Sequence, residues 1–123
     1  MADLSHLSRM LIVEDEALIL LDLQSTLEDA GVSEVVTAVS LDEALALIET
    51  NSFDAAVLDL HLNRSGWSYA AAQQLEAKGV PFVFSSGTVD VADSRFGHVP
   101  LVSKPFAPDE LVGALRKVTA EAV

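Results

Sequence analysis

Side chains that can do chemistry follow four of the five short apolar runs in this sequence. Glu14 and Asp15 follow the first run, Asp59 the third, Ser86 the fourth and Lys104 the fifth. Three carboxylates in one place repel one another unless a cation lies among them, and oxygen ligands in an open site suit Mg²⁺. The lysine can pair with a phosphoryl oxygen, and the serine hydroxyl can donate a hydrogen bond to another. These residue types predict phosphoryl transfer to an aspartate, with metal and lysine neutralising the charge of the transferring group.

Such chemistry requires elements that bring the ends of the runs together. Runs of strand length occupy 10–13, 35–39, 55–60, 81–85 and 99–103. Helical patterns occupy 17–30, the segment after Ser40, 68–78 and the segment from Pro108 onward, while 93–98 is compatible with a short helix. This alternation predicts a parallel sheet covered on both faces, because parallel strands need crossover connections. Ligands of such sheets bind outside the carboxyl ends of the strands, where the reactive residues should meet.

Two expected helices carry further information. Ser40 is the expected N-cap of the second helix, and Glu43 follows three residues later as in a capping box. The first helix has four successive apolar residues, 18–21, which is more than one inward stripe requires. Part of this segment must face outward or toward a neighbour, so it is a candidate for kinase docking or for a homodimer interface.

Composition narrows the class of protein. With 123 residues, half of them apolar, the chain can form one domain, which we expect to span 1–123 with a core at about 9–120. The net charge of −12 argues against binding to nucleic acid or to anionic membranes. There are no cysteines, and the apolar stretch 17–21 is far too short to span a membrane. We therefore expect a soluble, cytoplasmic protein.

The sequence resembles response-regulator receiver domains of two-component signalling. The resemblance covers nearly the whole chain and rests on motifs in the family's order and spacing: Val13-Glu14-Asp15-Glu16, Leu58-Asp59-Leu60, Ser86-Gly87 and Lys104-Pro105-Phe106. It implies an α/β, flavodoxin-like (βα)5 three-layer sandwich with a five-stranded parallel sheet in the order 2-1-3-4-5, for which a receiver protein is a known example.

The resemblance also implies roles for individual residues. Asp59 would be the phosphoacceptor, and Ser86 and Lys104 would contact the phosphoryl group. The phosphoryl donor would be a sensor histidine kinase or a histidine phosphotransfer protein, and the phosphorylated form would control an output protein that the sequence does not identify.

A magnesium site is implied by the same resemblance. Glu14 and Asp15 would bind Mg²⁺ directly or through water, together with Asp59 and the backbone carbonyl of His61.

The rings of His6 and His98 lack the spacing of a zinc site. We expect the ring of His61 to face solvent, and Trp67 to serve packing more than partner binding.

Some positions depart from the family. Asn63 stands where receivers usually have proline, which with Arg64-Ser65-Gly66 predicts a longer or looser loop. Leu101 stands where many receivers have an aromatic ring. In those receivers, rotation of the ring is coupled to the hydroxyl at the position of Ser86. The segment 79–87 is similar to a subgroup of single-domain receivers with a Pro-Phe-x-Phe-x-Thr-Gly segment, known mainly from alphaproteobacteria and linked to general stress signalling, which also tends to lack this ring.

The interpretation we favour is a stand-alone switch with autophosphotransfer activity, and not a metabolic enzyme. The last helix runs to the end of the sequence, so no output domain is expected to follow. Three alternatives remain: a receiver-like module that binds partners without phosphorylation, a receiver excised from a larger kinase or regulator, and a magnesium-dependent phosphohydrolase. The last usually has a second aspartate two residues after the nucleophile, where this chain has His61.

Overall fold

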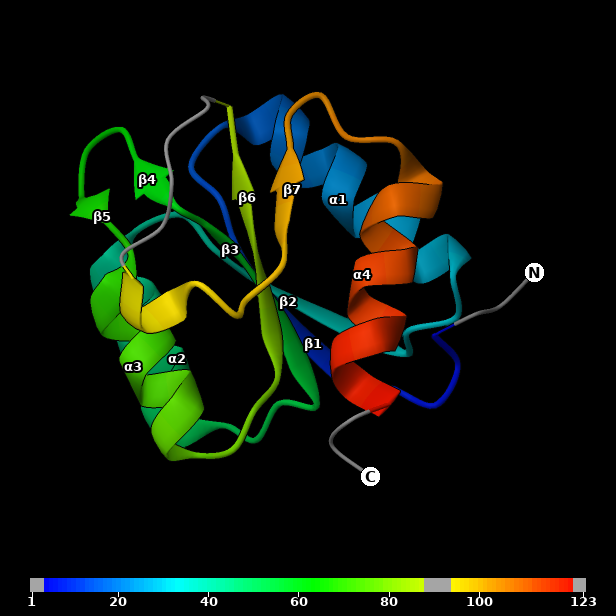
Figure 1. The fold of residues 1–123 in the computed structure, drawn as a ribbon, viewed down its shortest axis with the longest axis horizontal. Helices are drawn as coiled ribbons and strands as arrows, with labels where there is room; N and C mark the ends of the chain where they lie inside the picture. The colour runs from blue at the N-terminus through cyan, green and yellow to red at the C-terminus, as the bar shows by residue number, and fades with distance from the viewer. Residues whose placement is uncertain (1–3, 88–93, 121–123) are drawn as a thin grey trace.

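Strands and helices alternate along the chain as the apolar pattern predicts. The computed structural model describes residues 4–87 and 94–120. Their elements, labelled in Figure 1, are β1 (Arg9–Val13), α1 (Ala17–Asp29), β2 (Glu34–Ala38), α2 (Leu41–Thr50), β3 (Ala55–Asp59), β4 (His61–Leu62), β5 (Gly66–Trp67), α3 (Tyr69–Ala77), β6 (Phe82–Ser86), the 3₁₀ turn η1 (Ser94–Phe96), β7 (Leu101–Ser103) and α4 (Pro108–Ala120). The short helix expected within 93–98 is η1, and position 93 lies outside the described residues.

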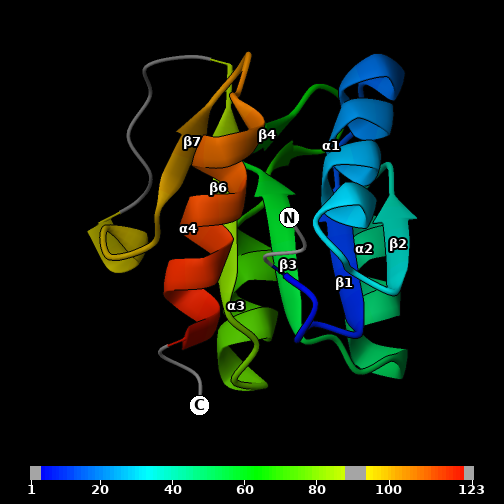
Figure 2. The same ribbon diagram turned by 90° about the vertical axis from the view of Figure 1, so that its right-hand side faces the viewer.

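The central sheet is parallel, and its strand order is β2-β1-β3-β6-β7. Counting only these five strands, the order is the expected 2-1-3-4-5, which confirms the flavodoxin-like fold. Helices α1 and α4 pack on one face and α2 and α3 on the other, as the two views in Figures 1 and 2 show. The result is the three-layer sandwich that the sequence predicts.

Alternating side chains of the central strands build two cores. In β1, Met10 and Ile12 pack with α1 and α4, whereas Leu11 and Val13 pack with α2 and α3. All four are fully buried, and each such side chain contributes about 1.5–3 kcal/mol of stability. Because β1 and β3 are buried on both faces, the positions of the residues that follow them are fixed by the core.

The start of α2 forms as its sequence predicts. The hydroxyl oxygen of Ser40 accepts a hydrogen bond from the Glu43 backbone N–H at 3.1 Å. Glu43 Oε1 in turn accepts one from the N–H of Val39 at 2.8 Å, one residue before the cap residue itself. The first bond satisfies one of the N–H groups that a helix N-terminus otherwise leaves free, and the second holds the Glu43 side chain against the residue before the cap.

The segment after β3 differs from the prediction. The longer or looser loop expected around Asn63 is wrong, because β4 and β5 form a tight antiparallel hairpin in which His61 pairs with Trp67 and Leu62 with Gly66. Gly66 has a φ of 80°, the left-handed conformation that closes short hairpins of this kind and that glycine adopts without strain.

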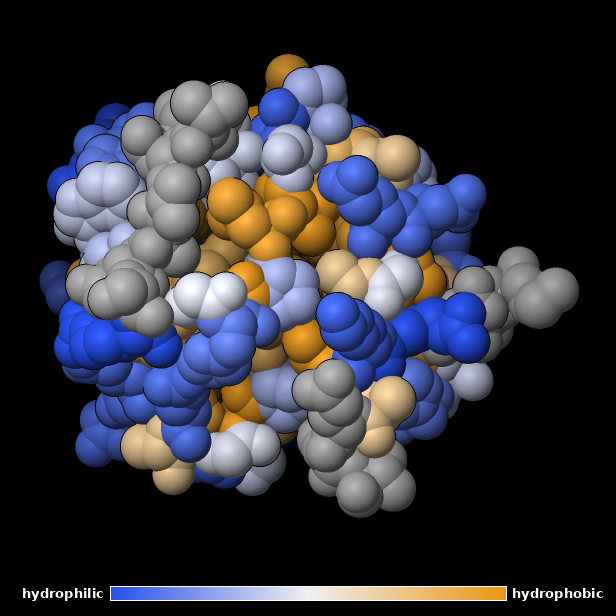
Figure 3. Space-filling view, viewed as in Figure 1, coloured by the Kyte–Doolittle hydropathy of each residue, from blue (hydrophilic) through white to orange (hydrophobic). Residues whose placement is uncertain are grey.

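Some apolar side chains lie on the surface. Leu18 and Leu21 are 82% and 61% exposed on α1, which confirms that part of 18–21 faces outward. Leu101 is 41% exposed on the edge strand β7, and Figure 3 shows hydrophobic surface over this strand. Within the described residues, every helix is too short or too polar to cross a membrane.

Candidate functional site

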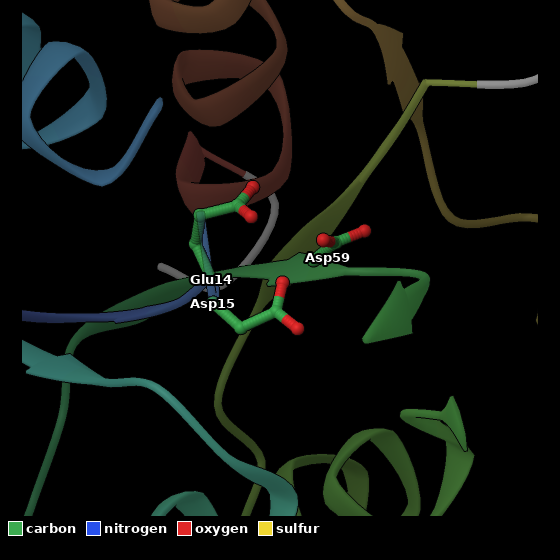
Figure 4. Close-up of side chains that lie close together, drawn as sticks. All are labelled: Glu14, Asp15 and Asp59. Atoms are coloured by element: carbon green, nitrogen blue, oxygen red, sulfur yellow. The ribbon is translucent and has the colours of Figure 1, made fainter. Parts of the chain in front are cut away.

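The carboxyl ends of β1 and β3 bring three carboxylates together. Glu14 and Asp15 directly follow β1, and Asp59 is the last residue of β3, the neighbouring strand. Figure 4 shows the three side chains around one small region of space. One oxygen from each lies within 4.8 Å of the others, so the convergence expected from the parallel sheet is present.

Lys104 supplies positive charge to this cluster. It follows β7, and its backbone N–H donates to the carbonyl oxygen of Ser86 at 2.8 Å. Its Nζ donates to Asp59 Oδ2 at 3.0 Å and lies 2.7 Å from Glu14 Oε1. The second contact has the distance of an ion pair but not the angles of a hydrogen bond. One ammonium group thus balances two buried carboxylates.

Burial and charge act on these groups in opposite directions. Burial raises the pKa of Glu14 above its ordinary value of 4.5, and the charge of Asp59 adds to the rise. The Lys104 ammonium and the Glu16 backbone N–H, which donates to Glu14 Oε2 at 3.0 Å, lower the pKa but do not outweigh burial. For Lys104, burial lowers the pKa, but its contacts with Glu14 and Asp59 outweigh burial and raise it above 10.5. The lysine is therefore charged at neutral pH.

The donor set fits a hard divalent cation. Asp15 Oδ1 is buried without a hydrogen-bond partner, although buried carboxylate oxygens normally have one, and Glu14 Oε1 is contacted by the Lys104 ammonium at 2.7 Å. Three clustered carboxylates and few other ligands are typical of Mg²⁺, which keeps several of its waters. The expected ligands Glu14, Asp15 and Asp59 therefore lie together, while the role of the His61 carbonyl stays a prediction.

Ser86 is the last residue of β6 and is buried. Its position at the same sheet edge is as expected, and its contact with a phosphoryl group stays a prediction. In the strand register, Ser85 and not Ser86 pairs with Asp59, and the Ser85 hydroxyl is buried without a hydrogen-bond partner. Sequence reasoning singled out Ser86, which precedes Gly87, and not Ser85, because the sequence does not show the strand register that places Ser85 opposite Asp59.

Backbone donors also reach the cluster from the β4–β5 hairpin. The N–H of His61 donates to Asp59 Oδ1 at 3.3 Å, and the N–H of Asn63 donates to Asp15 Oδ2 at 2.7 Å. Neither contact could be predicted from residue types, because any residue except proline supplies a backbone N–H. The His61 side chain is exposed, as expected.

Comparison with known proteins identifies the family. Residues 10–116 match the profile of the response regulator receiver domain. The chain belongs to this family. The receiver domain is 37% identical over 108 residues to the alginate biosynthesis transcriptional regulatory protein AlgB of Pseudomonas aeruginosa, a match that covers 84% of the chain and 24% of that protein. Among the first curated relatives, the matched region spans from about a quarter to about half of their length.

Solved structures agree with this assignment. The solution structure of SdrG from Sphingomonas melonis Fr1 has a TM-score of 0.82 and 39% sequence identity to the receiver domain, over 96% of this chain and 98% of that one. The response regulator PhyR from Brucella abortus has a TM-score of 0.73 and 25% identity, over 93% of this chain and 48% of that one.

Proposed function

We propose that this receiver domain accepts a phosphoryl group on Asp59 in a Mg²⁺-dependent reaction and then changes conformation to control a partner protein. The observation that carries the proposal is the position of Lys104 Nζ, 3.0 Å from Asp59 Oδ2, in a cluster of three carboxylates in which Asp15 Oδ1 is buried without a hydrogen-bond partner. A nucleophile, a cation and a set of metal ligands thus occupy one sheet edge. These are the components that phosphoryl transfer to an aspartate requires.

In the proposed reaction, a carboxylate oxygen of Asp59 attacks the phosphorus of a phosphohistidine. The new O–P bond forms as the P–N bond to the donor imidazole breaks, and the imidazole leaves with its electron pair. Mg²⁺, when bound, would neutralise negative charge on the phosphoryl oxygens. Lys104 would exchange its contact with Asp59 for one with a phosphoryl oxygen, and the Ser86 hydroxyl would donate to another.

The partners follow from this chemistry. The donor would be a sensor histidine kinase or a histidine phosphotransfer protein, and the output would be binding to another protein in the cytoplasm. The exposed Leu18 and Leu21 offer a surface for such a partner or for a second copy of the chain. The activity proposed is self-modification, which makes the protein a switch and not a metabolic enzyme.

Incubation with acetyl phosphate and Mg²⁺ tests the proposal. Intact mass spectrometry should show the addition of one phosphoryl group to the wild-type chain and none to Asp59→Asn. Asp29→Asn is the matched control, because Asp29 is an exposed carboxylate at the end of α1, and this variant should be modified like the wild type. Equal modification of Asp59→Asn would overturn the proposal, and a wild type that stays unmodified would favour a receiver-like module that works without phosphorylation.

A further inference from the structure

Many receivers have an aromatic ring at the position that responds to the phosphorylation state, but this chain has no ring there. That position is Leu101, which is 41% exposed on β7. Its Cα partner in the sheet is Phe84 of β6, so Leu101 is next to the strand that ends in Ser86. This position therefore offers no ring through which the state of Asp59 could reach the rest of the domain.

Three stacked rings begin at the β4–β5 hairpin. Trp67 of β5 stacks on Tyr69, the first residue of α3, with ring centroids 5.7 Å apart and an angle of 8° between the rings. Tyr69 stacks in turn on Phe96 of η1, at 5.6 Å and 4°. We call these three residues the aromatic stack. It runs from a half-exposed end at Trp67 to a fully buried end at Phe96.

The hairpin joins this stack to the acidic site. Across the hairpin, Trp67 pairs with His61, and its ring meets the His61 imidazole edge-on at 4.9 Å. The backbone N–H of His61 donates to Asp59, and that of Asn63 donates to Asp15. The two carboxylates that hold the hairpin are therefore the same carboxylates that would receive the phosphoryl group and the metal.

Any change in these carboxylates must affect the hairpin donors. Phosphorylation of Asp59 converts one carboxylate oxygen into the bridging oxygen of an acyl phosphate, and Mg²⁺, when bound, would draw the remaining oxygens of the cluster toward itself. A hydrogen bond at 3.3 Å, as between His61 and Asp59, is long and easily lost. The three rings are in contact over nearly parallel faces, and the interior around Phe96 is close-packed, so a shift of the first ring would be transmitted to its neighbours.

We propose that the aromatic stack couples the state of the Asp59 site to the position of η1, in place of a ring at position 101. This coupling rests on the proposed function, since it needs a phosphoryl group or its mimic at Asp59. The stack takes the signal to the side of the sheet that α2 and α3 cover, where Phe96 packs against Phe84 and Phe82. Trp67 is the only tryptophan of the chain, so its fluorescence reports on the first ring alone.

The test adds Mg²⁺ and beryllofluoride, a non-covalent mimic of the phosphoryl group, to the full chain. Two signals are followed: the emission of Trp67 and the amide resonance of Phe96 in ¹⁵N-edited NMR spectra. Tyr69→Leu removes the middle ring of the stack, and Tyr69→Phe keeps the ring without its hydroxyl. Leu101→Ala is the control, because it changes the position at which many receivers have their aromatic ring.

In the wild type, both signals should shift on addition of the mimic. Tyr69→Leu should keep the Trp67 response, because the hairpin still contacts the carboxylates, but should lose most of the Phe96 shift. Tyr69→Phe and Leu101→Ala should retain both responses. Should Tyr69→Leu fail to fold, Trp67→Leu interrupts the same stack at its half-exposed end and should likewise lose the Phe96 shift.

Two results separate the coupling from the function on which it rests. A Phe96 shift that survives in Tyr69→Leu, or that is lost only in Leu101→Ala, overturns the coupling while the proposed function stands. A wild type that shows no response at Trp67 or Phe96 and takes no phosphoryl group from acetyl phosphate overturns the proposed function and the coupling with it.

Discussion

Lys104 balances two buried carboxylates, so replacing it with methionine should destabilise the metal-free protein and do so much less when Mg²⁺ is present. Its Nζ lies 2.7 Å from Glu14 and 3.0 Å from Asp59, and its side chain is 10% exposed. Removing one partner of a buried ion pair costs about 3–5 kcal/mol. Because Glu14 already has a raised pKa and can take up a proton, we expect the lower end, about 3 kcal/mol, which is about 10 °C in melting temperature for a domain of this size.

Thermal and urea unfolding with EDTA or with saturating Mg²⁺ measure this difference. The divalent cation should replace the missing charge and reduce the loss to about 1 kcal/mol. Lys117→Met is the matched control, because Lys117 is exposed on α4, and its loss should stay within about 0.5 kcal/mol under both conditions. A loss at Lys104 that is the same with and without Mg²⁺ would show that the lysine acts through packing, and would refute the charge-balance argument.

Further predictions concern the same carboxylates and one helix cap. Mg²⁺ at ten times its dissociation constant should stabilise the wild type by about 1.4 kcal/mol, which is about 5 °C in melting temperature. Calorimetry should show a smaller gain in melting temperature for Asp15→Asn. Equal gains for the two proteins would exclude Asp15 as a ligand. In EDTA, Glu14→Gln should melt above the wild type at neutral pH, because a raised pKa means that the folded state holds the charged form unfavourably. This gain should shrink as the pH falls through the raised pKa toward 4.5, and a gain independent of pH would contradict it. Ser40→Ala should lower the free energy of unfolding by about 1 kcal/mol in urea titrations, since it removes the acceptor for the Glu43 N–H, and no loss would show that the cap is dispensable.

Much of the fold follows from local patterns in the sequence. Short apolar runs such as 10–13 and 55–60 are typical of inner strands, and the cap at Ser40 and the proline at position 108 mark where helices begin. The strand order, by contrast, came from the family resemblance, because apolar runs do not reveal which strands are neighbours. The β4–β5 hairpin was mispredicted, because the missing proline at Asn63 suggested looseness while the backbone conformation of Gly66 closes a tight turn.

The site divides in a similar way. Glu14, Asp15, Asp59 and Lys104 could be placed together from residue type, because the carboxyl ends of parallel strands meet at one edge. The pairing of one ammonium with two carboxylates depends on side-chain geometry across three strands, and no sequence pattern encodes it. The hairpin contacts with Asp15 and Asp59 come from backbone N–H groups, which every residue except proline has. Their direction is set by the tertiary structure and not by the residue type.

The central claim is that the phosphoryl group is carried by Asp59. Borohydride reduces an aspartyl phosphate to homoserine, so treating the acetyl phosphate reaction with borohydride, followed by peptide mass spectrometry, locates the modified residue. We predict homoserine at position 59 in samples with Mg²⁺, and far less of it when EDTA is added. Homoserine at another aspartate, with position 59 unchanged, would contradict this account.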